Sequence, residues 1–171
     1  MQVNKREIVG HWESDSVVGG DRKTGLNVII ERTTRLVNIS LMKNKTARET
    51  KSAVIRRLSN HPDERVKSIT YDNGSENVLH QEINDRLGVP SFFCEPCHSW
   101  EKDSVEQVNG LIRRYLPKGT NFNNITAAEI NRIENTTQQS DQKMFKLQNT
   151  MRDVQASAWC TCRLNVAITN F

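Results

Sequence analysis

The spacing of apolar residues divides the first part of the chain into short strands. Residues 12–19 predict a strand with imperfect alternation, and two segments rich in β-branched residues, 26–32 and 36–41, predict two more. The second and third strands are separated only by residues 33–35, which suit a hairpin connection. Because short turns join antiparallel neighbours, we expect the chain to begin with three antiparallel strands.

Helix and strand patterns alternate after residue 42. Thr46 and Glu49 form a capping-box pattern at the start of a helix, and Gly88 is a stop signal at the end of another. The predicted elements are a helix over 46–60, a strand over 66–71, a helix over 78–87 and a strand over 90–94. Strands joined through helices run parallel, so we predict an α/β fold with a mixed five-stranded sheet, three antiparallel strands and then two parallel ones, with helices packed on it.

A third helix follows, with Ser104 and Gln107 as its capping box and Pro117 at its end. Its predicted buried stripe consists of Val105, Val108, Ile112 and Tyr115. Glu106 lies off that stripe and shares its face with Asn109, Gly110 and Arg113. The surface beside Glu106 is therefore expected to be polar and cationic.

Three carboxylates stand out in this arrangement: Asp15 within an apolar strand, Asp72 at the end of another, and Glu106 on the third helix. An aspartate in an apolar strand is costly unless it is paired or binds a metal. Taken alone, Asp72 in Asp-Asn-Gly is more often a turn residue, and Glu106 a solvated carboxylate. Carboxylates that converge from separate elements can hold two divalent cations, which is the equipment of phosphodiester chemistry.

Composition fits one soluble domain of 171 residues, with 36% hydrophobic and 26% charged residues. The 24 Lys and Arg against 20 Asp and Glu give a net charge of +4, which says little about nucleic acid unless it is clustered. Residues 1–7 contain no apolar signal core, and no segment has the ~18 uninterrupted apolar residues of a membrane span. We therefore expect a cytoplasmic protein.

The cysteines leave two readings open. Cys94 and Cys97, with His98, spell the C-x-x-C-H of a haem attachment site, but haem attachment needs export, which the N-terminus does not support. Zinc binding with Cys160 and Cys162 is an alternative, although their C-x-C spacing is looser than usual. Unpaired thiols in a reducing compartment are the favoured interpretation.

Three ordered motifs resemble one family. They are His-Trp-Glu-Ser-Asp at 11–15, Tyr-Asp-Asn-Gly-Ser-Glu at 71–76, and the segment 99–120, which holds Glu106 and ends in Tyr-Leu-Pro-Lys-Gly-Thr. From about residue 6 to about residue 134 the chain resembles the catalytic core of bacterial DDE transposases of the insertion-sequence-thirty type. That resemblance implies the ribonuclease H-like fold shared with retroviral integrases.

The resemblance also implies a site and a reaction. Asp15, Asp72 and Glu106 would hold two Mg²⁺ or Mn²⁺ ions for DNA strand cleavage and transfer, by a chain that acts on DNA as a homo-oligomer. Expected DNA contacts are Asn109, Arg113, Arg114 and Lys118, with solvated charge as the alternative for the cations. Trp12, Trp100, His11 and His98 are interpreted as structural residues.

Two other functions remain open. A structure-selective nuclease of the same fold would use water in place of a DNA 3′-hydroxyl as the nucleophile. A non-catalytic fragment would bind DNA in a salt-sensitive way without metal-dependent products.

The chain departs from the family in three respects. Asp103 stands where related sequences usually have glycine, and it adds a negative charge one helical turn before Glu106. The core begins almost at residue 1, so we expect no helix-turn-helix for sequence-specific DNA recognition in this chain. After Thr136 the sequence no longer follows the family, which has an Asn-Asn-Arg-Pro segment and a Leu-x-Tyr-x-Thr-Pro-x-Glu stretch here.

We hypothesise that a frameshift explains the departure that starts at Thr136. Synonymous codons for residues 138–155, read one base later, can spell NNRTKKCLNYKTPCEMFK, which restores most of the missing motif. We therefore divide the chain into a catalytic core over 1–135 and a tail over 136–171 that is frameshifted, atypical and expected to be disordered.

This hypothesis predicts the nucleotide sequence of the gene. Its codons for residues 138–155, translated one base later, should read as the peptide above with few changes. Sequencing the gene decides it, and a shifted frame without that peptide would exclude the frameshift.

Overall fold

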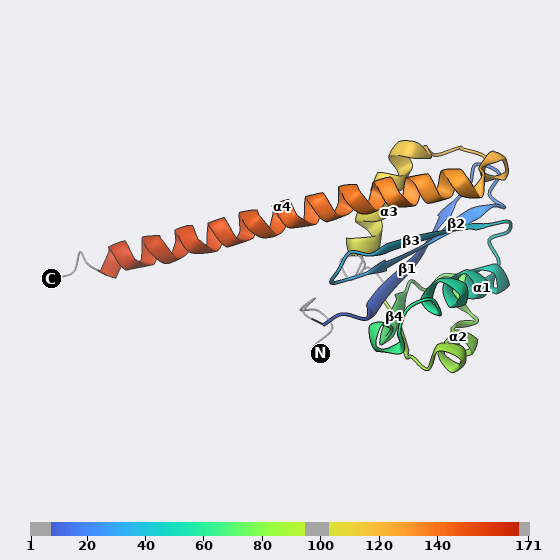
Figure 1. The fold of residues 1–171 in the computed structure, drawn as a ribbon, viewed down its shortest axis with the longest axis horizontal. Coiled ribbons are helices and arrows are strands. Elements are labelled where there is room, and N and C mark those ends of the chain that lie inside the picture. Colours follow the sequence, from blue (N-terminus) through green and yellow to red (C-terminus); the bar gives the residue numbers. More distant parts are fainter. Residues whose placement is uncertain (1–7, 95–102, 168–171) are drawn as a thin grey trace.

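The computed structural model describes residues 8–94 and 103–167, with the side chains of the second segment described from residue 104 to residue 147. Five strands form one sheet in the order β3-β2-β1-β4-β5. Figure 1 labels β1 to β4 of this sheet. They are β1 (His11–Val18), β2 (Gly25–Glu31), β3 (Val37–Met42), β4 (Ser68–Tyr71) and β5 (Ser91–Phe93). β1, β2 and β3 are antiparallel neighbours, whereas β4 runs parallel to both β1 and β5. The predicted mixed sheet is confirmed.

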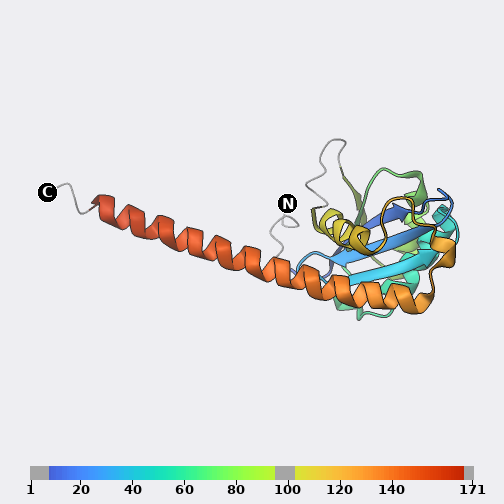
Figure 2. The ribbon, with the colours of Figure 1, turned by 90° about the horizontal axis from the view of Figure 1, so that it is seen from above.

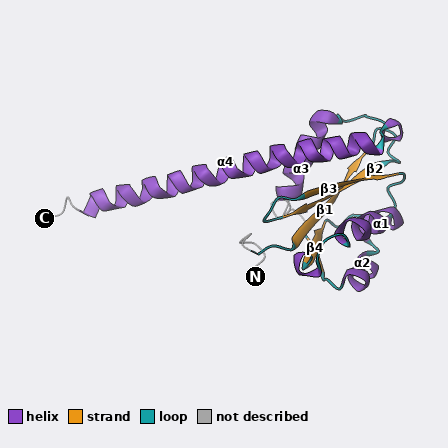
Figure 3. Cartoon of the chain, in the orientation of Figure 1, coloured by secondary structure: helices purple, strands orange, loops and turns teal. Residues whose placement is uncertain are grey.

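Helices cover both faces of the sheet (Figure 3). They are α1 (Ala47–Leu58), α2 (His80–Leu87), α3 (Asp103–Tyr115) and α4 (Ala127–Ala167), joined by 3-10 turns at Asp63–Arg65, Ser75–Asn77 and Phe122–Asn124. Val28 and Ile30 of β2 pack in one core with α3 and α4, whereas Ile29 packs in the other with α1 and α2. Every residue of β2 is buried for this reason, and its sequence reads as an almost continuous apolar run.

The sequence signals predicted at the start of α1 and at the end of α2 act as expected. The hydroxyl of Thr46 accepts a hydrogen bond from the amide of Glu49 at 3.4 Å. Gly88 ends α2 with φ +68°, a left-handed conformation in which glycine has no Cβ penalty. Local capping chemistry therefore decides where α1 begins and where α2 ends, whereas α2 begins at His80 without a side-chain cap and α1 ends at Leu58.

The capping box predicted for α3 is wrong. Ser104 lies inside the helix, and its buried hydroxyl has no hydrogen-bond partner in the described part of the structure. The side chain of Gln107 accepts from Arg35 at 2.8 Å instead of reaching back to the helix start. A carboxylate from the sheet, Glu13, accepts the amide of Val105 at 2.9 Å, so a tertiary contact holds this helix end.

The predicted apolar stripe of α3 is correct except at its end. Val105, Val108 and Ile112 are fully buried, but Tyr115 is 47% exposed. Leu116 is buried in its place, because it follows Ile112 by four residues and so lies on the same face.

The segment after residue 136 differs from the disordered tail that we predicted. It continues α4, which lies along the sheet and then extends beyond the domain in both views (Figures 1 and 2). Thr137 and Asp141 are fully buried, and Asp141 forms two hydrogen bonds with Arg35, at 2.8 and 2.7 Å. Residues 136–147 thus contact the domain through polar groups, which apolar periodicity does not reveal. Their origin in a shifted reading frame stays a prediction.

The contact of Asp141 with Arg35 predicts a large stability effect. Asp141→Ala would leave the Arg35 guanidinium buried without its carboxylate, which costs about 3–5 kcal/mol of unfolding free energy. Urea unfolding measures it, with Glu82→Ala as control, because Glu82 forms an exposed ion pair with Lys51 that contributes about 0–1 kcal/mol. Equal losses in the two variants would show that α4 is not docked at Asp141.

Candidate active site

The register of β1 and β4 brings two of the predicted carboxylates together. His11, Trp12 and Glu13 pair in parallel with Ser68, Ile69 and Thr70. Continued by two residues, the same register sets Asp15 alongside Asp72, the residue directly after β4. Neighbouring strands lie about 4.8 Å apart and residues in register share a face, so the two half-buried residues are neighbours on one face of the sheet.

Hydrogen bonds from its own loop hold Asp72. Its Oδ1 accepts from the side-chain amide of Asn77 at 2.7 Å and from the backbone amide of Gly74 at 3.2 Å. Asn77 also donates to the backbone carbonyl of Asp72, and it is only 5% exposed. The turn after β4 therefore orients this carboxylate.

Glu106, the third predicted carboxylate, lies on α3, and this helix is hydrogen-bonded to Asp15. Asn109 on α3 donates its side-chain N–H to Oδ2 of Asp15 at 2.7 Å. Glu106 lies one turn before Asn109 on α3, and its side chain is exposed. The fold thus places Glu106 on the helix beside Asp15, while its carboxylate faces solvent.

Within residues 8–94 and 104–147, no three His, Cys, Asp or Glu side chains lie close enough together to hold a metal ion. The donor set nevertheless fits Mg²⁺ or Mn²⁺, because three carboxylates supply the oxygen ligands that these cations prefer. The Oδ1 atom of Asn109, beside Asp15, is buried and has no partner in the described structure. A cation or water at Asp15 would satisfy that acceptor.

The predicted DNA contacts occupy different settings. Arg113 is half-buried and donates to the backbone carbonyls of Val18 at 3.0 Å and Leu116 at 3.4 Å. Arg114 and Lys118 are exposed. Asn109, also predicted to contact DNA, uses its side-chain N–H on Asp15.

Trp12 and His11, which we interpreted as structural residues, contact other parts of the domain. Trp12 is 1% exposed and donates to the carbonyl of Arg65 at 2.8 Å. His11 contacts the hydroxyl of Ser68 at 2.7 Å, and burial, with the charge of Arg32 next, lowers the pKa of His11. Cys94 is buried at the end of β5. His98, Trp100 and Cys97 lie outside the described residues, as do the side chains of Cys160 and Cys162.

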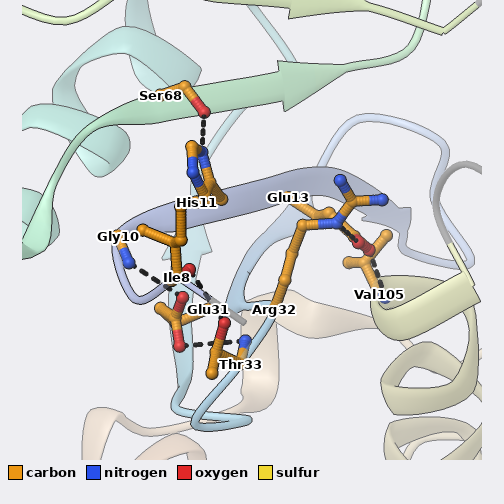
Figure 4. Close-up of polar contacts among 9 residues, drawn as sticks. All are labelled: Ile8, Gly10, His11, Glu13, Glu31, Arg32, Thr33, Ser68 and Val105. Carbon is orange, nitrogen blue, oxygen red and sulfur yellow. Dashed lines mark hydrogen bonds and ion pairs between the residues drawn. The ribbon is translucent and has the colours of Figure 1, made fainter. Parts of the chain in front are cut away.

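Sequence reasoning missed the buried charges next to the site (Figure 4). Glu13 is fully buried and pairs with Arg32 at 2.6 Å. Glu31 accepts from the amides of Gly10, Thr33 and Thr34. The argument that singled out Asp15, a carboxylate inside an apolar strand, applies equally to Glu13 and could have found it.

No protein-family model matches the chain. It is 38% identical over 136 residues to the transposase for insertion sequence element IS4351 of Bacteroides fragilis, covering 78% of this chain and 40% of that protein. It is 33% identical over 132 residues to the IS1086 transposase of Cupriavidus metallidurans, covering 77% and 39%. Transposase InsI of IS30A from Escherichia coli is 31% identical over 131 residues, covering 77% and 34%. The chain therefore spans well under half the length of these relatives.

Two solved structures share the fold. The catalytic core domain of BIV integrase superposes with a TM-score of 0.53 at 15% identity, covering 75% of this chain and 80% of that one. A chain of the simian T-cell lymphotropic virus intasome in complex with PP2A regulatory subunit B56 gamma gives 0.57 at 18% identity, covering 77% and 47%. The predicted ribonuclease H-like fold is confirmed.

The hydrogen bond from Asn77 to Asp72 should stabilise the folded chain by a measurable amount. Asn77→Ala removes a buried donor to a carboxylate and should lower the unfolding free energy by about 1.5–3 kcal/mol. Asn123→Ala is the matched control, because exposed Asn123 donates to Asp21 at 3.0 Å, and it should cost less than ~0.5 kcal/mol. Urea unfolding compares the two, and similar losses would mean that Asn77 does not hold Asp72.

Proposed function

Because this chain is a homologue of insertion-sequence transposases and has an integrase-core fold, we propose that it is a transposase catalytic core that cleaves and joins DNA strands. Asp15, Asp72 and Glu106 are its metal ligands in this proposal. The chain spans 34–40% of the length of these relatives, so assigning their activity to this chain is part of the proposal.

One observation carries the proposal. Asp15, in the middle of β1, lies in register with Asp72, the residue directly after the adjacent parallel strand β4, and Asp15 is hydrogen-bonded to the helix that bears Glu106. The three proposed ligands thus come from three separate elements that contact or pair with one another, which supports the proposal. Like charges that approach one another repel, so a bound cation would stabilise these three carboxylates near one another.

In this proposal, the hydrogen-bond donors to Asp15 and Asp72 orient the two carboxylates. Asn109 orients Asp15, and Asn77 with the amide of Gly74 orients Asp72, so both carboxylates are held in fixed rotamers. Two bound Mg²⁺ or Mn²⁺ ions would supply activation of the attacking oxygen and stabilisation of the leaving oxygen.

DNA is the proposed substrate, and a homo-oligomer is the proposed acting form. Exposed Arg114 and Lys118 follow Glu106 on the same helix and the loop after it, where they can contact phosphates. Arg113 positions the end of α3 through its bond to the carbonyl of Val18. None of the helices described here is long and apolar enough to cross a membrane.

The exposed side chain of Glu106 favours a second candidate, a DNA-binding fragment without catalysis. Such a chain would bind DNA in a salt-sensitive way but show no metal-dependent products. A nuclease of the same fold is distinguished by its nucleophile: it would release cut DNA without joining a 3′-hydroxyl end to a target strand.

The first test is thermal unfolding with and without Mg²⁺ or Mn²⁺. A cation that binds only the folded chain should stabilise it by about 2.7 kcal/mol at a concentration of 100 Kd. Asp72→Asn should abolish the rise in Tm. Asp85→Asn, which removes an exposed carboxylate from α2, is the matched control and should retain it.

The second test is strand transfer with an oligonucleotide that carries a free 3′-hydroxyl. Wild-type chain with Mn²⁺ should yield joined products, and Asp72→Asn should yield none. A wild-type Tm indifferent to both cations would contradict the metal site, and DNA binding without products would support the non-catalytic fragment.

A further inference from the structure

Glu13 connects β1 to the first turn of α3. Its side chain is fully buried, with Oε1 paired to Nε of Arg32 at 2.6 Å and Oε2 accepting the backbone amide of Val105 at 2.9 Å (Figure 4). Arg32 follows β2 directly, so one carboxylate joins three elements. The proposed mechanism gives this residue no task.

The two contacts between β1 and α3 flank Glu106. Residues two apart on a strand share a face, so Glu13 and Asp15 both point toward α3. Glu13 accepts from Val105, and Asp15 accepts from Asn109, one helical turn later. Glu106 lies between these attachment points, directly after the first of them.

The position of α3 decides where Glu106 can reach. Its exposed side chain makes no described contact that would hold it near Asp15, so the helix backbone sets its distance from the sheet. A negative charge near the first turn of a helix stabilises that turn through the unsatisfied amides. Arg32 offsets the cost of burying the charge of Glu13.

We propose that Glu13 is a positioning residue of the metal site, which holds the first turn of α3 against β1 and thereby sets Glu106 within reach of ions at Asp15 and Asp72. This inference rests on the proposed function. Glu13 itself does not bind the metal, since both of its oxygens are engaged by Arg32 and Val105.

Mn²⁺ binding to the full 171-residue chain, measured by calorimetry, tests the proposal. In Glu13→Gln an NH2 group, which is a donor, replaces one of the two carboxylate oxygens, so the side chain cannot accept from Val105 and Arg32 as the two oxygens of Glu13 do. The Kd for Mn²⁺ should rise about 10- to 100-fold, the usual cost of losing a residue that orients metal ligands. Glu13→Asp keeps the charge beside Arg32, but its side chain is too short to reach both partners, and it should show the same weakening.

Glu31→Gln is the matched control. Glu31 is equally buried on the neighbouring strand, and its described hydrogen bonds go to Gly10, Thr33 and Thr34, none of them on α3. It should lower the Tm as Glu13→Gln does, but change the Mn²⁺ Kd less than about twofold. Equal Kd values for wild type and both Glu13 variants, or an equal rise in Glu31→Gln, would overturn the proposal.

Amide hydrogen exchange without metal separates this inference from the proposed function. Glu13→Gln should speed exchange at Val105 and its neighbours on α3, whereas Glu31→Gln should speed it at residues 33–34. If wild-type chain binds no Mn²⁺, the proposed function fails, and the exchange result alone decides whether Glu13 holds α3. Unchanged exchange at Val105 would then overturn the positioning role as well.

Discussion

The pairing of β1 on both of its sides is the constraint on which the site depends. Its antiparallel register with β2 and parallel register with β4 bring Asp15 beside Asp72 and turn Glu13 and Asp15 toward α3. A slip of one residue would turn both β1 carboxylates into the opposite core, among Ile29, Ile69 and other apolar residues. The apolar residues on each face of the sheet therefore determine which acidic residues can meet.

Buried charges connect the sheet to its helices. Glu13 with Arg32 holds the start of α3, and Asp141 with Arg35 holds α4. Such pairs are desolvated, so they contribute little net stability, but breaking one is costly. Their effect is to exclude alternative positions of the helices, which matters where Glu106 must approach the sheet.

The edge strand β3 explains why α4 continues past residue 136. Glu134 accepts from the amide of Ile39, and Gln138 accepts from the amide of Val37 and donates to the carbonyl of Arg35. These side chains are four residues apart on α4, so they meet alternate residues of β3 and satisfy amides that no further strand pairs. Polar side chains thus dock a segment whose apolar pattern predicted no packing.

Local patterns in the sequence determined the strands, the start of α1, the end of α2 and the mixed sheet, because apolar periodicity and caps act over a few residues. The choice of Asp15, Asp72 and Glu106 as candidates came from three ordered motifs that resemble one family. Tertiary structure alone decided the rest: the register that aligns Asp15 with Asp72, the Glu13 contact that replaces the predicted cap of α3, and the docking of α4. The Glu13 contact and the docking of α4 depend on single hydrogen bonds and ion pairs between residues 92 or more positions apart, and the alignment of Asp15 with Asp72 depends on strand register. Neither long-range contacts nor strand register produces a periodic pattern in the sequence, so the sequence alone does not predict them.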